Sequence, residues 1–433
     1  SFSLGWNVAR ENFWKPLESV VNQFKLRGSW GELGNQNTSN LYPFYEILPV
    51  KSNSGNWLVN GGKTNTADIP SLVSTLLTWE RVRSFNVGFD FGAFSNRLTG
   101  SFDYFVRKTV DMVGPAPQLP LVLGIAPAIV NNADMKSYGF EIELSWRDRI
   151  GEVDYGVKFN LADAQQKVVK YPNTTNAFSD WYAGKMSGEI WGYTSLGIAK
   201  TDEEMKEHLA SLPNGGQNQL GNKWGAGDIM YADINGDGKV DGGKGTLADP
   251  GDQRIIGNST PRYNFGLVLD ASYKGFDVSI FFQGVGKRDY APIVGTNGAV
   301  FWGAVNNIWQ SMAMEEHFDY FRPEGHPMGA NLNGYYPRPD FTSNKNHQVQ
   351  TRYLQDASYI RLKNLQIGYT LPKQWINKLH INRCRVYVSG DNLWTGTSLA
   401  SMFDPETLAA GDWGSGKTYP LSKVISFGLN VNF

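Results

Sequence analysis

The sequence of 433 residues lacks the features that define several common protein classes. No window approaches the run of about 18 apolar residues that a membrane-spanning helix requires, which excludes a helical membrane protein. The single cysteine, Cys384, cannot form an internal disulfide, so the chain has no disulfide framework. Forty basic and 41 acidic residues nearly cancel without any dense basic stripe, so nucleic acid is not an expected partner.

Catalytic motifs are also missing. The five histidines lie in unrelated contexts, and neither HExxH nor GxSxG occurs. The stretches WGAGD and GAGDWGSGK contain glycine but lack the spacing of a phosphate-binding loop. We therefore predict that the protein is not an enzyme and that it has no catalytic residues and no organic cofactor.

Aromatic residues are abundant, with 14 Trp, 20 Tyr and 24 Phe, and they alternate with polar residues. In the closing stretch SKVISFGLNVNF, one face of an extended chain receives Ile425, Phe427, Leu429, Val431 and Phe433, while serine, glycine and asparagine fall on the other. This period of two predicts a strand with one face in water and the other against an apolar medium.

The same alternation recurs along the chain in roughly a dozen segments, many of them as long as the 9 to 11 or so residues of a tilted membrane strand. A soluble β-sandwich or propeller is the weaker alternative, because its strands are shorter and more evenly spaced. We predict an all-β fold, a transmembrane antiparallel β-barrel with long extracellular loops. The predicted strand regions are approximately 1–9, 21–31, 80–109, 136–165, 260–286, 352–371, 381–391 and 422–433, and the long irregular loops are approximately 166–259 and 284–351.

Several stretches together resemble one family. They are KLRGSWGELGNQN, DINGDGKVD with QRIIGNSTPRYNFG, YKGFDVSIFFQGVG, YLQDASYIRLKNLQIGYTLP, RVYVSGDNLWT, FDPE and the closing SFGLNVNF. In this order they are similar to the C-terminal half of SusC-like (RagA-like) TonB-dependent outer-membrane transporters. The resemblance implies the C-terminal portion of a plugged barrel of about 22 strands, integral to the bacterial outer membrane.

The family also implies parts and partners that these residues do not contain. The plug domain, the TonB-contact segment and the export signal are expected upstream, in an N-terminal portion that is either separated by a nick or simply outside this chain. By resemblance, the partners are that portion, the TonB complex acting through it, a SusD-like lipoprotein lid, and an oligosaccharide or oligopeptide substrate. A dimer of transporter and lipoprotein pairs is also implied.

The end of the chain has a further implied role. Terminal alternation that ends on an aromatic residue resembles the signal by which barrel-assembly machinery recognises its clients. We assign this role to Phe427, Leu429, Val431 and Phe433.

DINGDGKVD is the sharpest local motif. Its side-chain oxygens stand at positions one, three, five and nine of an EF-hand-like loop, Gly238 provides the turn at position six, and position seven offers a backbone carbonyl. These hard oxygen ligands favour a structural divalent cation, most simply Ca²⁺, although position twelve is Lys244 instead of a bidentate glutamate; Asp249 or Asp252 could complete the shell, and a metal-free turn is the alternative. The predicted ligands are Asp233, Asn235, Asp237, Lys239 and Asp241.

Aromatic residues in the long connections are candidates for ligand contact, because their faces stack on sugar rings or peptide side chains. The alternative is that these rings pack the loops together or form an aromatic girdle at the membrane surface. The candidates are Trp181, Tyr182, Trp191, Trp224, Trp302, Trp309, Tyr335, Tyr336 and Trp413.

Taken together, these patterns favour TonB-dependent active import of a nutrient across the bacterial outer membrane under a SusD-like lid. The first alternative is an outer-membrane receptor or adhesin whose barrel only displays ligand-binding loops. The second is a soluble calcium-binding β-protein, which the apolar strand faces disfavour.

Overall fold

The structure is a computed structural model of the chain. This structure describes residues 1–36, 44–70, 72–74, 76–116, 120, 122, 124–125, 127–292, 299–303, 314–340, 345–377, 380–408 and 418–433. None of the helices in these segments is long and apolar enough to cross a membrane.

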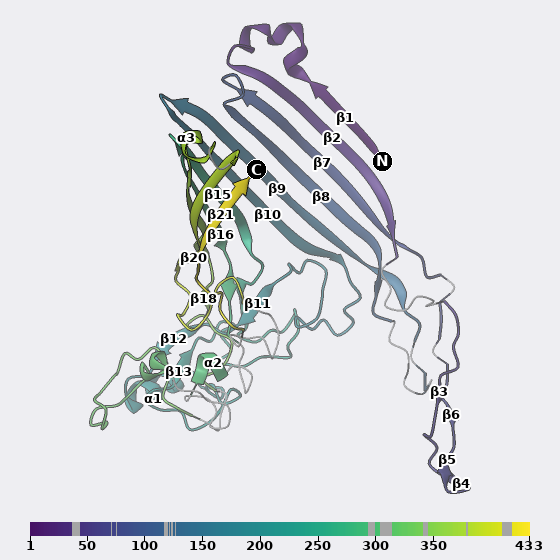
Figure 1. Cartoon of the computed structure of the whole chain (residues 1–433). Coiled ribbons are helices and arrows are strands. Elements are labelled where there is room, and N and C mark those ends of the chain that lie inside the picture. The colour runs from purple at the N-terminus through teal and green to yellow at the C-terminus, as the bar shows by residue number, and fades with distance from the viewer. Residues whose placement is uncertain are drawn as a thin grey trace.

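One antiparallel sheet of 11 strands dominates the molecule, and its strands are ordered as they occur in the chain (Figure 1). Within the described residues the first and last strands each have only one partner, so the sheet is curved but not closed. The strands are β1 (Phe2–Asn7), β2 (Val21–Asn35), β7 (Glu80–Ala93), β8 (Leu98–Gly114), β9 (Val130–Ile150), β10 (Val153–Lys170), β15 (Arg262–Tyr273), β16 (Phe276–Lys287), β19 (Tyr359–Thr370), β20 (Arg383–Thr397) and β21 (Val424–Asn432).

Short connections join the strands at one end of the sheet. Lys274 and Gly275 both have positive φ, as a two-residue hairpin turn requires, and they join β15 to β16. In their described residues, the other connections at this end contain only turns or short helical segments (Figure 1). These segments are η1 (Val8–Arg10) and η2 (Asn12–Leu17) between β1 and β2, and α3 (Lys373–Ile376) between β19 and β20.

The strands differ in length from the sequence prediction. Strand β9 starts at Val130 and β10 ends at Lys170, beyond the predicted limits of 136–165. These added strand ends have few large apolar residues, so the apolar alternation that marked the strands fades there. Conversely, residues 352–358 do not belong to a long strand, because the Arg352 and Tyr353 side chains are hydrogen-bonded into the loops.

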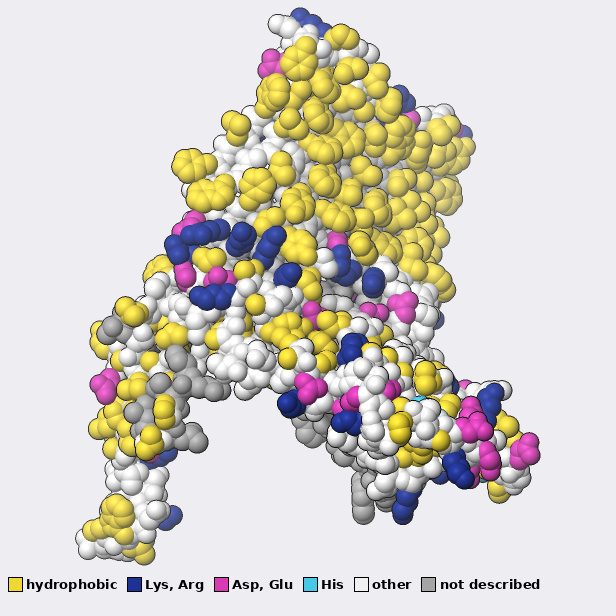
Figure 2. All heavy atoms as spheres, turned by 180° about the vertical axis from the view of Figure 1, so that it is seen from behind, with side chains coloured by type: hydrophobic (Ala, Val, Ile, Leu, Met, Phe, Trp, Pro, Cys, Tyr) yellow, Lys and Arg dark blue, Asp and Glu magenta, His cyan; other side chains and the backbone are white. Residues whose placement is uncertain are grey.

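The pairing register places apolar residues in continuous rows on one face of the sheet. Figure 2 shows a broad apolar surface on this face. Phe427 of β21 pairs with Val388 of β20 and is 85% exposed. The predicted alternation is therefore confirmed as the two-sided pattern of a membrane β-sheet. One row runs through Trp6, Leu26, Phe89, Phe102, Ile142, Leu161 and Phe265 on seven adjacent strands.

The opposite face is polar and carries ion pairs. The Arg27 guanidinium donates to both carboxylates of Asp90 and Asp103, with nitrogen–oxygen distances of 2.8 to 2.9 Å. Arg385 and Asp277 form a second cross-strand pair on β20 and β16. Charged groups on this face thus satisfy one another beside water, which is typical of a barrel interior.

The long connections at the other end fold together into a compact unit, which we call the loop module. It comprises the described parts of residues 171–261, 288–358 and 398–423, and its rings and aliphatic side chains share one buried core. Most of the described residues of the module lie outside helices and strands, but short elements and the shared core pack these loops together. The elements are β11 (Glu189–Gly192), β12 (Ser195–Ile198), α1 (Asp202–Ala210), β13 (Ile229–Tyr231), β14 (Arg254–Asn258), β17 (Asp289–Tyr290), α2 (Ala299–Trp302), η6 (Glu315–Phe318) and β18 (Gln355–Asp356).

The connection between β2 and β7 is different, because it extends away from the sheet as a narrow arm (Figure 1). The arm, which is the described part of residues 44–79, contains two small antiparallel ladders. They pair β3 (Val50–Lys51) with β6 (Thr66–Ala67) and β4 (Leu58–Val59) with β5 (Gly62–Lys63).

Candidate functional site

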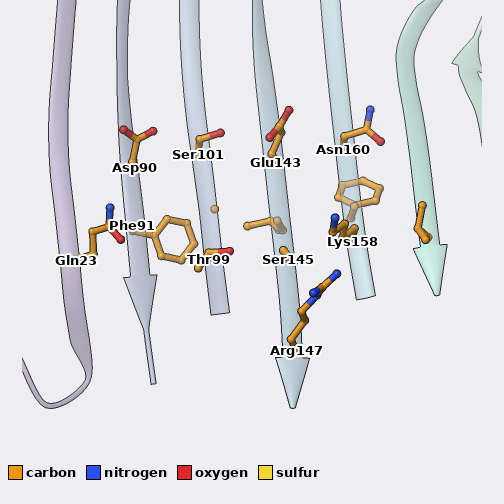
Figure 3. A pocket seen from close by; sticks show the side chains of 14 residues that line it. Gln23, Asp90, Phe91, Thr99, Ser101, Glu143, Ser145, Arg147, Lys158 and Asn160 are labelled. Atoms are coloured by element: carbon orange, nitrogen blue, oxygen red, sulfur yellow. The ribbon is translucent and has the colours of Figure 1, made fainter. Parts of the chain in front are cut away.

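The polar face of the sheet is hollowed by a cavity of about 780 Å³. Asp90, Ser101, Glu143 and Asn160 point into it from β7, β8, β9 and β10, each paired in register with the next (Figure 3). Lys158 on β10 adds a cationic group to the same wall. Such a wall of acids, amides and a lysine can hold a polar partner by hydrogen bonds and charge.

Three predicted ligand-contact residues lie together in the segment before and within β11. The Tyr182 hydroxyl donates to a Glu189 carboxylate oxygen at 2.5 Å, and burial with this bond raises the pKa of Tyr182 to about 12. Trp181 is 40% exposed, and the Lys185 ammonium lies 5.7 Å from its ring centre. Trp191 stacks on Phe178 with ring centres 4.5 Å apart. Of the three, the Trp181 ring is the most accessible to a ligand.

The other described candidates belong to the core of the loop module. Trp302 and Tyr336 are 1% and 2% exposed, with ring centres 6.1 Å apart, so neighbouring side chains cover both and no ligand reaches them in this conformation. The Tyr335 hydroxyl accepts a hydrogen bond from Gln355, and Trp224 packs edge-on against Tyr231. Packing accounts for these rings. The remaining candidates, Trp309 and Trp413, lie outside the described residues.

The aspartate-rich loop is held in its turn by its own side chains. The two carboxylate oxygens of Asp233 accept the backbone N–H groups of Gly236 and Gly238 at 2.6 and 2.8 Å. Asn235 and Asp237 each accept a backbone N–H two residues further on. Both glycines have positive φ, 76° and 82°, which explains their place in the sequence.

Asp252 folds back onto this loop, but its carboxylate accepts hydrogen bonds from backbone N–H groups of the loop. It is fully buried and accepts the N–H groups of Ile234 and Asp241, both at 2.8 Å, and burial raises its pKa. The Lys239 ammonium lies 2.5 Å from an Asp241 carboxylate oxygen and lowers the pKa of that acid.

The oxygen-rich composition of the loop fits a hard cation, but its side chains have hydrogen-bond partners inside the chain. Within the described segments, no group of three or more His, Cys, Asp or Glu side chains is placed to hold a metal ion. The Lys239 ammonium also competes for Asp241. Calcium binding by Asp233, Asn235, Asp237, Lys239 and Asp241 therefore stays a prediction.

A buried ionic cluster in the loop module was not found from the sequence. Asp228 is fully buried and accepts bonds from Arg338 at 2.6 and 2.8 Å, from Lys345 at 2.9 Å, and from Asn346 at 2.9 Å. These partners lie 110 or more residues away, beyond the reach of spacing arguments. The only local sequence signal near Asp228 is the glycine-containing stretch WGAGD, which ends at this residue.

The FDPE stretch fastens a third loop to the sheet. Asp404 and Glu406 accept bonds from the Arg361 guanidinium at 2.6 and 2.8 Å, and Lys363 binds Glu406 at 2.9 Å. Arg361 and Lys363 stand on β19 within YIRLKN. The motifs FDPE and YIRLKN, which are far apart in the sequence, thus form one cluster of ion pairs between a loop and a strand, which we call the clamp.

Comparison with known proteins gives the class. The model of the TonB-dependent receptor-like β-barrel family matches residues 1–393. The chain therefore belongs to this family, whose members, SusC included, are outer-membrane receptors and transporters and not enzymes. The resemblance inferred from the motifs is confirmed.

Individual relatives place the chain among SusC- and RagA-like proteins. TonB-dependent receptor P3 of Formosa agariphila is 29% identical over 463 residues, and SusC of Bacteroides thetaiotaomicron is 22% identical over 449. These alignments cover 100% of this chain but only 41% and 40% of the relatives. The structure of the RagAB peptide transporter matches with a TM-score of 0.72 at 22% identity, covering 100% of this chain and 43% of that one, which shows a shared fold. The chain thus spans less than half the length of these relatives.

Proposed function

We propose that this chain forms the C-terminal portion of the barrel of a nutrient importer in the bacterial outer membrane. The observation that carries the proposal is the two-sided sheet, with continuous apolar rows on one face and an ion-paired, hollowed polar face on the other. Lipid covers the first face, and the second lines the path that a polar substrate takes. Membership of the TonB-dependent receptor family supports the same conclusion.

The energy source and the missing barrel strands belong to the rest of the protein. An N-terminal portion supplies further strands and a plug, which occupies the hollow beside Asp90 and Glu143, and TonB acts on that plug from the periplasm. Among the described residues, β1 and β21 each have one edge without a partner strand, which supports this proposal because backbone groups in lipid must be hydrogen-bonded. Barrel-assembly machinery inserts the protein, and the role of Phe427, Leu429, Val431 and Phe433 in that step stays a prediction.

A SusD-like lipoprotein is the proposed partner at the loop end, and the arm is a candidate contact. Trp57, Leu58 and Leu76 on the arm are 60%, 67% and 83% exposed, beyond the apolar surface of the sheet. Exposed apolar side chains at such a density mark an interaction surface. A photo-crosslinking residue at position 57 of the full-length protein should join it to the lipoprotein. A crosslink only to the N-terminal portion of the same polypeptide would leave the mass of the transporter unchanged. The arm would then contact the transporter itself and not the lipoprotein.

The substrate is an oligosaccharide or an oligopeptide, held at the loop end and released when the plug moves. RagAB, a relative in fold, is described as a peptide transporter. The exposed ring of Trp181 offers a stacking surface that suits either class.

Uptake in the native host tests the import proposal. Cells that lack the gene are complemented with the full-length protein, and uptake of labelled oligosaccharide and oligopeptide pools is measured with and without functional TonB. Uptake should require both proteins, and Trp181→Ala should weaken substrate binding about three- to tenfold. Trp375→Ala, an exposed tryptophan at the other end of the sheet, is the matched control. Surface binding without TonB-dependent uptake would favour the receptor or adhesin alternative.

A further inference from the structure

A row of basic side chains crosses the apolar face of the sheet on four neighbouring strands. The pairing register places Arg83 of β7 opposite Lys108 of β8, Lys108 opposite Lys136 of β9, and Lys136 opposite Lys167 of β10. Paired residues of antiparallel strands share a face, so these four side chains stand side by side. We call Lys108, Lys136 and Lys167 the lysine row.

The lysine row lies where the apolar surface ends. Phe85, Val106 and Tyr138, the next residues on the same face, form an apolar row two residues closer to the short turns. Beyond the lysine row the strands continue toward the loop module and the arm. Figure 2 shows Lys and Arg side chains in a line along this border of the apolar surface. The position matches the level of lipid headgroups on the loop side of a membrane.

The charges of the lysine row are not neutralised within the described residues. Arg83 is paired, because its guanidinium lies 2.6 Å from a Glu32 carboxylate oxygen. No acidic side chain of the described segments lies within 4 Å of the three lysine ammonium groups, whereas arginines such as Arg27 and Arg385 each hold a carboxylate. The Lys136 ammonium instead lies 5.0 Å from the ring centre of Tyr138.

This arrangement has an energetic cost that an anion would remove. Like charges directly opposite each other on adjacent strands are destabilising. Three such strands span about 10 Å, which is the scale of one lipid headgroup. An anion at this border would receive charge-assisted bonds from more than one lysine, while acyl chains attached to it covered the apolar rows below.

We propose that the lysine row binds the phosphate groups of outer-leaflet glycolipid, of the lipid A type. This inference rests on the outer-membrane location proposed above. Charge complementarity and continuity with the lipid-covered apolar face favour a membrane lipid over a free anion or an acidic protein. The sugar-phosphate headgroup lies against the lysine row, and its acyl chains lie against residues such as Phe85 and Val106.

Lipid binding by the full-length transporter tests this assignment. The triple variant Lys108→Gln, Lys136→Gln, Lys167→Gln is purified from outer membranes in mild detergent, and bound lipid is identified by native mass spectrometry. Affinity for added lipid A should fall roughly 100-fold, since each basic residue near a charged membrane surface contributes a factor of about five. The matched control removes three lysines at the short-turn end, with Lys15→Gln, Lys274→Gln and Lys373→Gln, and should retain the lipid.

Further measurements distinguish a lipid phosphate from free phosphate and control for folding. Dephosphorylated lipid A should bind the unmodified protein as weakly as lipid A binds the triple variant, and inorganic phosphate should not compete at equal concentration. The triple Lys→Arg variant should bind normally and show the same heat-modifiable migration. Equal retention of lipid A by the Gln variant would overturn the inference, as would equal binding of the dephosphorylated form or displacement by free phosphate. If the protein is found in the outer membrane and imports substrate normally, such a result leaves the proposed function intact.

Discussion

The sheet and the loop module use the same aromatic residues in opposite ways. On the sheet, Phe276 and Phe427 are 57% and 85% exposed, whereas Trp302 and Tyr353 in the loop module are 1% and 2% exposed. The module buries its rings against one another as a water-soluble core does. The sheet turns its rings outward, which is stable only against lipid.

This contrast shows that aromatic content alone does not identify the surrounding medium. In the sheet, the period of two separates apolar and polar residues onto opposite faces, so the apolar face needs a second solvent. In the loop module, rings from three distant loops meet, so each one covers the others. Substitutions in the two regions should therefore destabilise the protein in different ways.

The largest expected effect is in the core of the loop module. Trp302→Ala removes a buried indole from contact with Tyr336 and Tyr353, and should destabilise the module by about 3–5 kcal/mol. Limited proteolysis of the purified transporter should cut the module rapidly, while the barrel keeps its heat-modifiable migration. The exposed Trp181→Ala serves as control and should change cleavage little. Loss of the folded barrel together with the module would contradict their separate stability.

The next effect should distinguish the two faces of one strand. Phe102→Lys places a charge in the apolar row of β8 and should cost about 2–4 kcal/mol if lipid covers this face. Ser101→Lys, one residue earlier, directs the same charge into the polar hollow beside Asp90 and Glu143. The amount of folded protein in outer membranes should fall for the first variant and not for the second. Equal behaviour of the pair would argue against a lipid-facing apolar side.

The clamp between sheet and loop should have a smaller effect. Asp404→Asn weakens the charged bond to Arg361 and should destabilise the 398–423 loop by about 1.5–3 kcal/mol, measured by hydrogen exchange. Glu207→Gln, on the exposed side of α1, is the control.

The same clamp should also respond to pH. Burial favours the protonated form of Asp404, but Arg361 and backbone N–H groups outweigh it, so the folded-state pKa is lowered. A lowered carboxylate pKa stabilises the fold above the ordinary value of about 3.9 and loses that contribution as the pH falls below it. The protection of the loop against hydrogen exchange, corrected for the pH dependence of the intrinsic exchange rate, should thus fall on acidification more in the unmodified protein than in Asp404→Asn. If the unmodified protein and Asp404→Asn responded identically to acid, the ion pair between Arg361 and Asp404 would not be the cause of the pH dependence.

The smallest expected effect concerns calcium. At roughly ten times its dissociation constant, calcium would stabilise the loop module by about 1.4 kcal/mol, and chelation would reverse this. Asp233→Asn with Asp237→Asn should abolish the response, and Glu207→Gln on the exposed side of α1 should preserve it. Calcium-independent unfolding of the unmodified protein would leave the motif as a turn held by its own hydrogen bonds.

The sequence by itself determined the strands, the two faces of the sheet and the family. Alternation needs only neighbouring residues, because successive side chains of a strand always point to opposite sides. It therefore predicted most of the strand regions and the outward direction of apolar side chains such as Phe427 and Leu429. The same local logic predicted the sharp turn at Gly238, where the structure has a positive φ.

Only the tertiary structure decided the rest of the candidate sites. Alternation could not tell an exposed Trp181 from a buried Trp302, because burial in the module depends on loops more than 100 residues apart. The Asp228 cluster and the lysine row arise in the same way. Lys108, Lys136 and Lys167 share no sequence spacing, and they become neighbours only because strand register aligns them. Register is fixed by hydrogen bonds between strands, which are interactions between distant parts of the chain.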